Sequence, residues 1–136
     1  MTPERPSSKR ALSGRTLDDV LDAFASSAPV PGGGSAAALA GAVGVALLIM
    51  VAGLKRRSGD TGADLLADAA ERLQPLRQQL TDLVDRDADA YASVMSALRL
   101  PKADETQAAA RRHALDAAMR SATEAPLETM RLCRRA

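Results

Sequence analysis

The feature that most constrains the fold of this chain is an uncharged stretch of 19 residues, from Ala36 to Leu54. A helix of this length could cross a membrane. Much of the stretch is Ala and Gly, however, which contribute little to membrane insertion, and no belt of Trp or Tyr flanks it. We therefore expect a helix over residues 35–57 that is buried on all sides in a helical protein, and keep a small membrane protein as an alternative.

Small residues recur at every fourth position of this stretch, at Gly34, Ala38, Ala42 and Ala46. On a helix they would form a smooth ridge along one face, and such a ridge allows another helix to approach closely. With that ridge exposed, a monomer would leave much apolar surface in water, so we expect self-association, most simply as a symmetric dimer.

Apolar residues with helical spacing recur along the rest of the chain, and no strand or hairpin pattern occurs. Thr16 can cap a short amphipathic helix, and Leu115 and Met119 would point inward from a later one. The expected helices cover about 16–26, 35–57, 61–99 and 104–124, followed by a last segment that begins at Pro126. We predict an all-α fold, an antiparallel helical bundle with a long buried central helix.

The length predicts a single domain over residues 15–136, after a flexible tail over residues 1–14 that is rich in Pro, Ser and charge. Its 18 basic and 17 acidic residues nearly balance, and Phe24 and Tyr91 are its only aromatic residues. We therefore expect no nucleic-acid partner. The single Cys133 and the single His113 exclude an intrachain disulfide and a multi-histidine metal site. With no signal-peptide pattern, we expect a cytoplasmic protein.

Asp87 interrupts the apolar seam of the third predicted helix, whereas Asp85 and Asp89 project onto its polar face. A carboxylate inside an apolar seam is costly unless it is paired, hydrogen-bonded or protonated, and such a carboxylate can serve as a general acid or base near neutral pH. The alternatives are that Asp87 pairs with a buried Arg or faces solvent at the edge of the bundle. The seam has a period of seven, filled in by intervening apolar residues: Leu66, Leu73, Leu80, Asp87 and Val94, with Leu76, Leu83, Val84, Tyr91 and Leu98.

The three consecutive glycines, Gly32 to Gly34, open the second predicted helix. Its free N–H groups could hold an anion or the polar edge of a ligand, although a plain turn capped by Ser35 is the commoner outcome. The motif lacks the spacing of a P-loop or of a dinucleotide fingerprint. Basic residues could meet the carboxylates of a ligand or simply lie solvated at helix ends: Lys55, Arg56, Arg57, Lys102, Arg111 and Arg112.

Four stretches together resemble a known enzyme family. They are APVPGGGSAAALAGAVGVALLIMVAGL at 28–54, LVDRDADAY at 83–91, LPK at 100–102 and APL at 125–127. In this order they are similar to the formiminotetrahydrofolate cyclodeaminase and methenyltetrahydrofolate cyclohydrolase family, which includes the cyclodeaminase half of formiminotransferase-cyclodeaminase. The resemblance extends over about residues 16–130.

The resemblance implies an all-α fold that forms homodimers and a folate derivative as substrate, with no cofactor beyond the tetrahydrofolate substrate and no metal. It implies that Asp87 is the proton carrier, either for cyclodeamination or for hydrolysis of the methenyl ring. It also implies that Pro31, Gly32, Gly33, Gly34 and Ser35 approach the folate and that Lys102 lines the same site. The family domain continues through further helices, so we expect a C-terminally truncated member. The alternative is a non-catalytic member that dimerises or binds a ligand.

Overall fold

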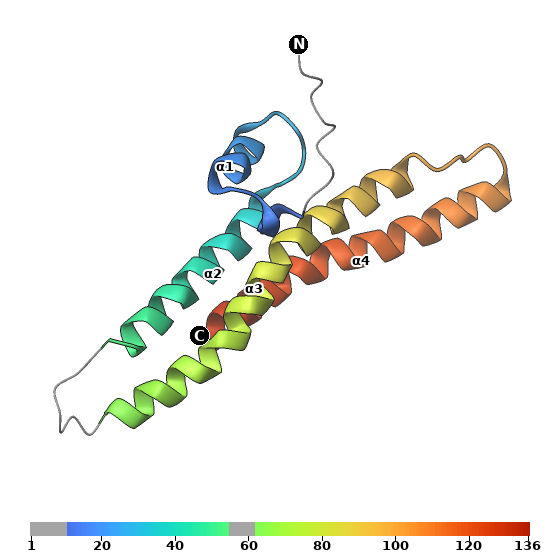
Figure 1. Ribbon diagram of the computed structural model, residues 1–136. Coiled ribbons are helices and arrows are strands. Elements are labelled where there is room, and N and C mark those ends of the chain that lie inside the picture. Colours follow the sequence, from blue (N-terminus) through green and yellow to red (C-terminus); the bar gives the residue numbers. More distant parts are fainter. Residues whose placement is uncertain (1–10, 55–61) are drawn as a thin grey trace, which may run out of the picture.

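The computed structural model describes residues 11–54 and 62–136. Within these ranges it contains helices and no strand, which confirms the predicted all-α class (Figure 1). Residues 1–10 of the predicted tail and the basic Lys55–Arg57 group lie outside the described residues. The elements in chain order are the short 3-10 helix η1 (Leu12–Gly14) and the α-helices α1 (Leu17–Ala25), α2 (Gly33–Ala52), α3 (Ala63–Leu98) and α4 (Glu105–Arg135).

The longest helix, α3, forms the axis of the molecule. Figure 1 shows α2 running antiparallel beside its first part and α4 antiparallel beside its second part, so that α3 contacts both. The core lies where the three helices meet, and Leu80, Leu83 and Leu132 are its largest fully buried side chains. Beyond this point, α3 and α4 extend together as a two-helix arm that ends at residues 99–104.

Side-chain caps begin two of the helices, and the one at Thr16 was predicted from the sequence. The Thr16 hydroxyl accepts the Asp19 N–H at 3.2 Å, and the Asp104 carboxylate accepts the Gln107 N–H at 2.7 Å. Each cap satisfies one of the N–H groups that the first turn of a helix leaves without a partner.

The predicted break before Pro126 is wrong, because α4 continues through it to Arg135. A proline removes one helical hydrogen bond, and the buried Ala125, Thr129 and Leu132 hold the helix against the core on both sides of that position. The inward assignment of Met119 is also wrong, since its side chain is 52% exposed and Ala118 is buried instead. Leu115 is half-buried.

The seam predicted on α3 is confirmed in its middle part, where Leu76, Leu80, Leu83 and Val84 are all buried. It opens beyond Asp87. Tyr91 and Leu98, which were expected in the same seam, are exposed. Figure 1 shows that the later part of α3 extends beside α4 beyond the start of α2.

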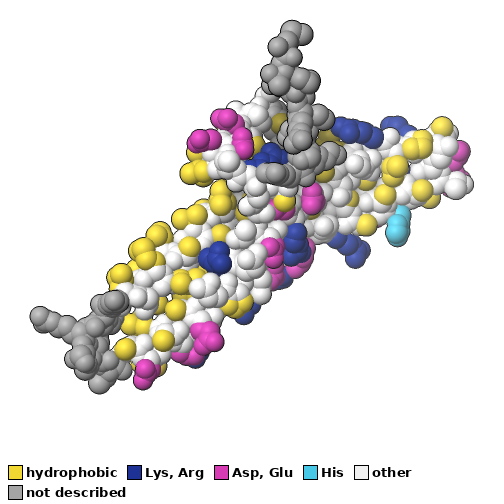
Figure 2. Space-filling model, viewed as in Figure 1, with side chains coloured by type: hydrophobic (Ala, Val, Ile, Leu, Met, Phe, Trp, Pro, Cys, Tyr) yellow, Lys and Arg dark blue, Asp and Glu magenta, His cyan; other side chains and the backbone are white. Residues whose placement is uncertain are grey.

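The expectation that α2 is buried on all sides is wrong. Only 22% of its most apolar window is buried, although by length and composition α2 could cross a membrane. One face packs on α3 through Ser35, Ala38, Ala42 and Val45. Figure 2 shows apolar side chains gathered along the rest of the helix. We call this set the outer face of α2; its exposed large side chains are Val43, Leu47, Leu48, Met50 and Val51.

The small-residue ridge on α2 is confirmed at Ala38 and Ala42 but not at Ala46, which is exposed. Four residues exceed one helical turn of 3.6, so a row spaced by four drifts around the helix, and Val45 replaces Ala46 against α3. Along this face the helices also approach closely at Gly41. A methyl group there would lie 2.9 Å from the Cys133 sulfur and 3.3 Å from Leu80.

The chain before α1 differs from the expected flexible tail at Leu12–Gly14. Leu12 is buried in the core, and η1 is held by Asp85 of α3. The Asp85 carboxylate accepts the Leu12 N–H and the Ser13 hydroxyl. Asp85 is therefore half-buried and bonded, whereas it was expected to project from the polar face; Asp89 is exposed, as expected.

The packing of α2 on α3 can be tested with Ala42→Leu. The added side chain would enter the closely packed face, and we expect it to lower the free energy of unfolding by about 1–3 kcal/mol. Thermal or urea unfolding would measure this change. Ala46→Leu is the matched control, because Ala46 is exposed and its replacement should change stability by no more than about 0.5 kcal/mol. Equal effects of the two substitutions on the free energy of unfolding would contradict the burial of Ala42 and the exposure of Ala46.

Candidate active site

The candidate site begins with a contact between α2 and α3. Ser35 is the third residue of α2, and its N–H donates to Oδ2 of Asp87 at 2.8 Å. Gly32, the N-cap residue of α2, has no side chain to make this bond, so a carboxylate from another helix caps the first turn. The N-terminus of a helix carries partial positive charge, which suits a carboxylate placed there.

The Ser35 hydroxyl strengthens the same contact from a fully buried position. Its oxygen lies 3.1 Å from Asp87 Oδ2 and 2.8 Å from the Val84 carbonyl oxygen. A hydroxyl has one proton, so it donates to one of these acceptors at a time. Ser35 is thus not the cap of its own helix, as one alternative predicted, but the partner that orients Asp87.

Gly34 is the glycine that this contact requires. A Cβ atom built there would lie 2.0 Å from Asp87 Oδ1 and 2.6 Å from Oδ2, which no real side chain allows. The carboxylate therefore occupies the space that any other residue at position 34 would fill. The same test finds open space at Gly33 and an ordinary contact at Gly32. Steric demand thus explains one of the three consecutive glycines.

The carboxylate faces a cavity of about 270 Å³ between the glycine turn, α3 and α4. Asp87 Oδ2 is held by Ser35, while Oδ1 has no hydrogen-bond partner within residues 11–54 and 62–136. One oxygen is thus fixed and the other is available to a ligand. Among the described residues Asp87 pairs with no Arg, and it is half-buried and not fully solvated, in contrast to the two alternatives. The lining residues are Pro29, Val30, Gly32, Gly33, Gly34, Asp87, Tyr91 and Ala122.

The structure brings together four of the residues predicted from sequence: Gly32, Gly33, Gly34 and Asp87 all line the cavity. Ser35 lies behind Asp87, and Pro31 does not line the cavity. Lys102 is exposed in the connection between α3 and α4 and does not line this cavity. Within one chain, the predicted contact of Lys102 with the substrate is therefore not supported, because Lys102 and Asp87 do not line the same cavity.

Sequence reasoning missed four residues of the lining, namely Pro29, Val30, Tyr91 and Ala122. Tyr91 could have been found, because it follows Asp87 by four positions and so shares its helix face. Pro29 and Val30 belong to the glycine turn, but their side chains have no polar or reactive group that would identify them as site residues. Ala122 comes from α4, and no local pattern links it to Asp87.

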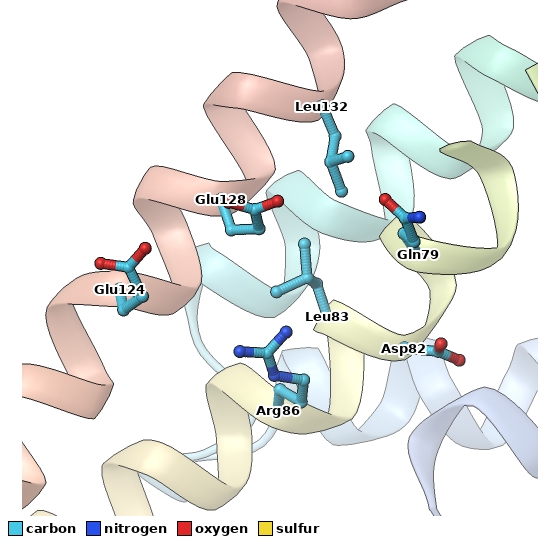
Figure 3. A pocket seen from close by; sticks show the side chains of 7 residues that line it. All are labelled: Gln79, Asp82, Leu83, Arg86, Glu124, Glu128 and Leu132. Carbon is cyan, nitrogen blue, oxygen red and sulfur yellow. The ribbon is translucent and has the colours of Figure 1, made fainter. Parts of the chain in front are cut away.

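A second cavity, of about 260 Å³, lies between α3 and α4 and is shown in Figure 3. Leu83 and Leu132 are its buried residues, and charged side chains surround them. Arg131 donates hydrogen bonds to Glu124 and Glu128, and these bonds, the one to Glu124 first, raise the pKa of the Arg131 guanidinium above its usual value. The pairs are exposed, so they contribute little to stability. None of the residues predicted from sequence lines this cavity.

Comparison with known proteins identifies related sequences along nearly the whole chain. The profile of the formiminotransferase-cyclodeaminase family matches residues 16–136. A methenyltetrahydrofolate cyclohydrolase of Methylorubrum extorquens is 42% identical over 122 residues, which cover 88% of this chain and 58% of that protein. A formimidoyltransferase-cyclodeaminase of Rattus norvegicus is 38% identical over 120 residues, which cover 82% of this chain and 22% of that protein.

A solved structure has the same fold. The crystal structure of formiminotetrahydrofolate cyclodeaminase from Thermotoga maritima aligns with a TM-score of 0.72 at 26% sequence identity. The alignment covers 89% of this chain and 57% of that one. This chain therefore spans less than two thirds of the length of each of these relatives.

The requirement for glycine at position 34 can be tested with Gly34→Ala. The added methyl group would displace the Asp87 carboxylate and break its bonds to Ser35, at a cost of about 1.5–3 kcal/mol for hydrogen bonds to a charged group. Thermal unfolding would measure this loss. Gly33→Ala is the matched control, since open space surrounds Gly33 and less freedom of the unfolded chain should raise stability by about 0.4–1 kcal/mol. If Gly34→Ala were as stable as Gly33→Ala, the close approach of Asp87 would be refuted.

Proposed function

We propose, since this chain belongs to the formiminotransferase-cyclodeaminase family, that it is a folate-dependent one-carbon enzyme in which Asp87 transfers protons. The reaction is the cyclodeamination of formiminotetrahydrofolate or the hydrolysis of methenyltetrahydrofolate, the two activities that the names of its relatives carry. The observation that carries the proposal is the Asp87 carboxylate, anchored through Oδ2 and presented to a cavity without a described partner on Oδ1.

Hydrolysis needs one group that first accepts and then donates a proton. Water adds to the carbon that bridges N5 and N10, and Asp87 takes a proton from that water as the C–O bond forms. The resulting adduct then breaks its bond from carbon to N5, and N5 takes the proton back from Asp87. The hydroxyl group of the adduct loses its proton to solvent as the C=O bond of the formyl group forms. The product is the neutral N10-formyl compound, and the released proton carries away the positive charge of the methenyl group.

Cyclodeamination uses the same carboxylate in the same order. N10 attacks the formimino carbon, and Asp87 accepts the N10 proton while the new C–N bond forms. Asp87 then donates this proton to the formimino nitrogen, which leaves as ammonia. The positive charge of the protonated formimino group remains on the methenyl product, so both charge and protons balance.

The glycine turn would hold the substrate beside this carboxylate. Gly32, Gly33 and Gly34 present backbone without side chains to the cavity, which suits close contact with a flat ring system. Pro31 and Ser35 would contribute by shaping the turn and by orienting Asp87. We expect no cofactor other than the tetrahydrofolate substrate.

Lys102 would act away from the reacting carbon. From Asp87 to the end of α3 at Leu98 there are 11 residues, or about 17 Å of helix, and Lys102 lies beyond that end. Its ammonium group could pair with a carboxylate on the glutamate part of the folate. This would make it a binding residue and not a proton carrier.

The exposed outer face of α2 supports a homodimer. Val43, Leu47 and Met50 are all exposed on α2 and follow one another at intervals of four and three, so they form one stripe on the helix. The exposed Leu54 follows just beyond the end of the helix. A second copy of this chain would cover that stripe, as a symmetric interface does with the same surface from both subunits. We propose a cytoplasmic homodimer that binds neither nucleic acid nor a membrane.

Asp87→Asn tests the proton carrier. Asn has the same shape and an oxygen that can accept the Ser35 N–H, but it cannot exchange a proton. Turnover should fall by about two to four orders of magnitude while the protein stays folded. Steady-state assays with formimino- and methenyltetrahydrofolate would measure turnover, and circular dichroism would check the fold. Asp89→Asn is the control, because Asp89 is exposed and outside the cavity. Turnover unchanged by Asp87→Asn would move the proton transfer to another group.

Leu47→Glu tests the proposed dimer. A charge in the centre of the outer face of α2 would oppose its burial, so we expect the protein to become monomeric at micromolar concentration. Sedimentation velocity in buffer without detergent would measure the change. Asp64→Ala, at an exposed position outside this face, is the control and should leave the dimer intact. A monomeric wild-type chain would refute the dimer, and a chain that sediments only with lipid vesicles would favour the membrane alternative.

A further inference from the structure

Tyr91 occupies a position in the candidate site that packing does not explain. It lines the cavity together with Asp87, one helical turn further along α3. It is one of two aromatic residues in the chain, and it is 39% exposed. A large aromatic side chain normally contributes to stability by being buried, so an exposed one beside a carboxylate points to a ligand.

Hydrogen bonding does not explain the position of Tyr91 either. Its hydroxyl makes no hydrogen bond to any of the residues that the structure describes. Its neighbours in the lining are the glycine turn and Ala122, which are small and leave space beside the ring. The cavity thus combines one aromatic ring, one carboxylate and a wall of backbone.

This combination matches a flat organic cation. The face of an aromatic ring attracts a cation placed over it, and a carboxylate attracts the same charge from another side. In both proposed reactions the reacting group is such a cation, because a carbon between two nitrogens shares one positive charge in the methenyl bridge and in the protonated formimino group. A formyl group in the same place is neutral.

We propose that Tyr91 is a substrate-binding residue whose ring selects the cationic amidine of the one-carbon group over its neutral formyl counterpart. The inference rests on the proposed function and deepens it. Tyr91 holds the amidinium carbon beside Asp87, and in the hydrolysis it releases the neutral formyl product more readily. It carries no proton, so its loss weakens binding and leaves the chemical step in place.

The test compares Tyr91→Phe with Tyr91→Leu. Phe keeps the ring and removes the hydroxyl, whereas Leu keeps apolar bulk and removes the ring. We expect Tyr91→Leu to raise KM for the cationic substrate about 3- to 30-fold with little change in kcat, and Tyr91→Phe to stay within about twofold of wild type. Phe24→Leu is the control for loss of an aromatic residue, because Phe24 does not line the cavity.

A neutral probe separates charge recognition from shape. In 5-formyltetrahydrofolate an oxygen replaces the cationic nitrogen of the formimino group, and its inhibition constant measures binding without the charge. We expect this constant to change less than about twofold in Tyr91→Leu, since cation–π attraction is absent. Circular dichroism would confirm that each variant is folded. If Tyr91→Leu does not fold, Tyr91→Gln also removes the ring and takes its place in the comparison.

Four outcomes would overturn the inference. Unchanged KM in Tyr91→Leu would show that the ring does not bind the substrate, and equal weakening of the cationic substrate and the neutral probe would show that shape alone matters. Loss of binding in Tyr91→Phe would assign the effect to the hydroxyl. A wild-type protein that converts neither substrate would refute the proposed function and this inference with it, whereas the first three outcomes leave the proposed function standing.

Discussion

The contact on which the rest of the site depends is the seating of the Asp87 carboxylate on the first turn of α2. It joins the two helices that make the largest interface, and it does so with a charge in place of apolar packing. The contact needs an unpaired N–H at Ser35, the absence of a side chain at Gly34 and a carboxylate directed from α3. Each of these requirements comes from a different part of the sequence, and the fold brings them together.

Under the proposed function Asp87 would have two roles, which oppose each other only in part. As a cap it stabilises the start of α2, and as a proton carrier it would have to change its charge during the reaction. The two oxygens divide these roles, because Oδ2 accepts the Ser35 N–H while Oδ1 has no hydrogen-bond partner among the described residues. Protonation at Oδ1 would keep the Ser35 N–H bonded to an oxygen. The carboxylate can thus stay in place through a catalytic cycle, which is the preorganisation that proton transfer requires.

The helices and the importance of Asp87 could be predicted from sequence, since both follow from periodic patterns along one segment. A carboxylate at the position where Leu66, Leu73 and Leu80 repeat has to be accommodated somehow, whatever surrounds it. Its partner could not be predicted, because Ser35 lies 52 residues away and reaches it only through the packing of α2 on α3. The same holds for Asp85, whose bond to η1 replaces the solvent expected around it. Ala122 joins the cavity for the same reason, as a residue without chemistry brought there by α4.

The failure to predict the burial of α2 has a different cause. Composition states how apolar a helix is but not what covers it, so a uniformly apolar helix fits a buried core, a membrane and a subunit interface equally well. In this chain α3 covers one face of α2, and η1 and α1 lie near its start. The outer face keeps its exposed apolar side chains from Val43 to Val51, while the charges of the chain lie mainly on the other helices. Because α2 also supplies Ser35 and Gly34 to the site, whatever covers its outer face fixes the helix that orients Asp87. In the proposed homodimer, assembly and catalysis would therefore be coupled through one helix, and an interface there would stabilise the geometry of the carboxylate without touching it.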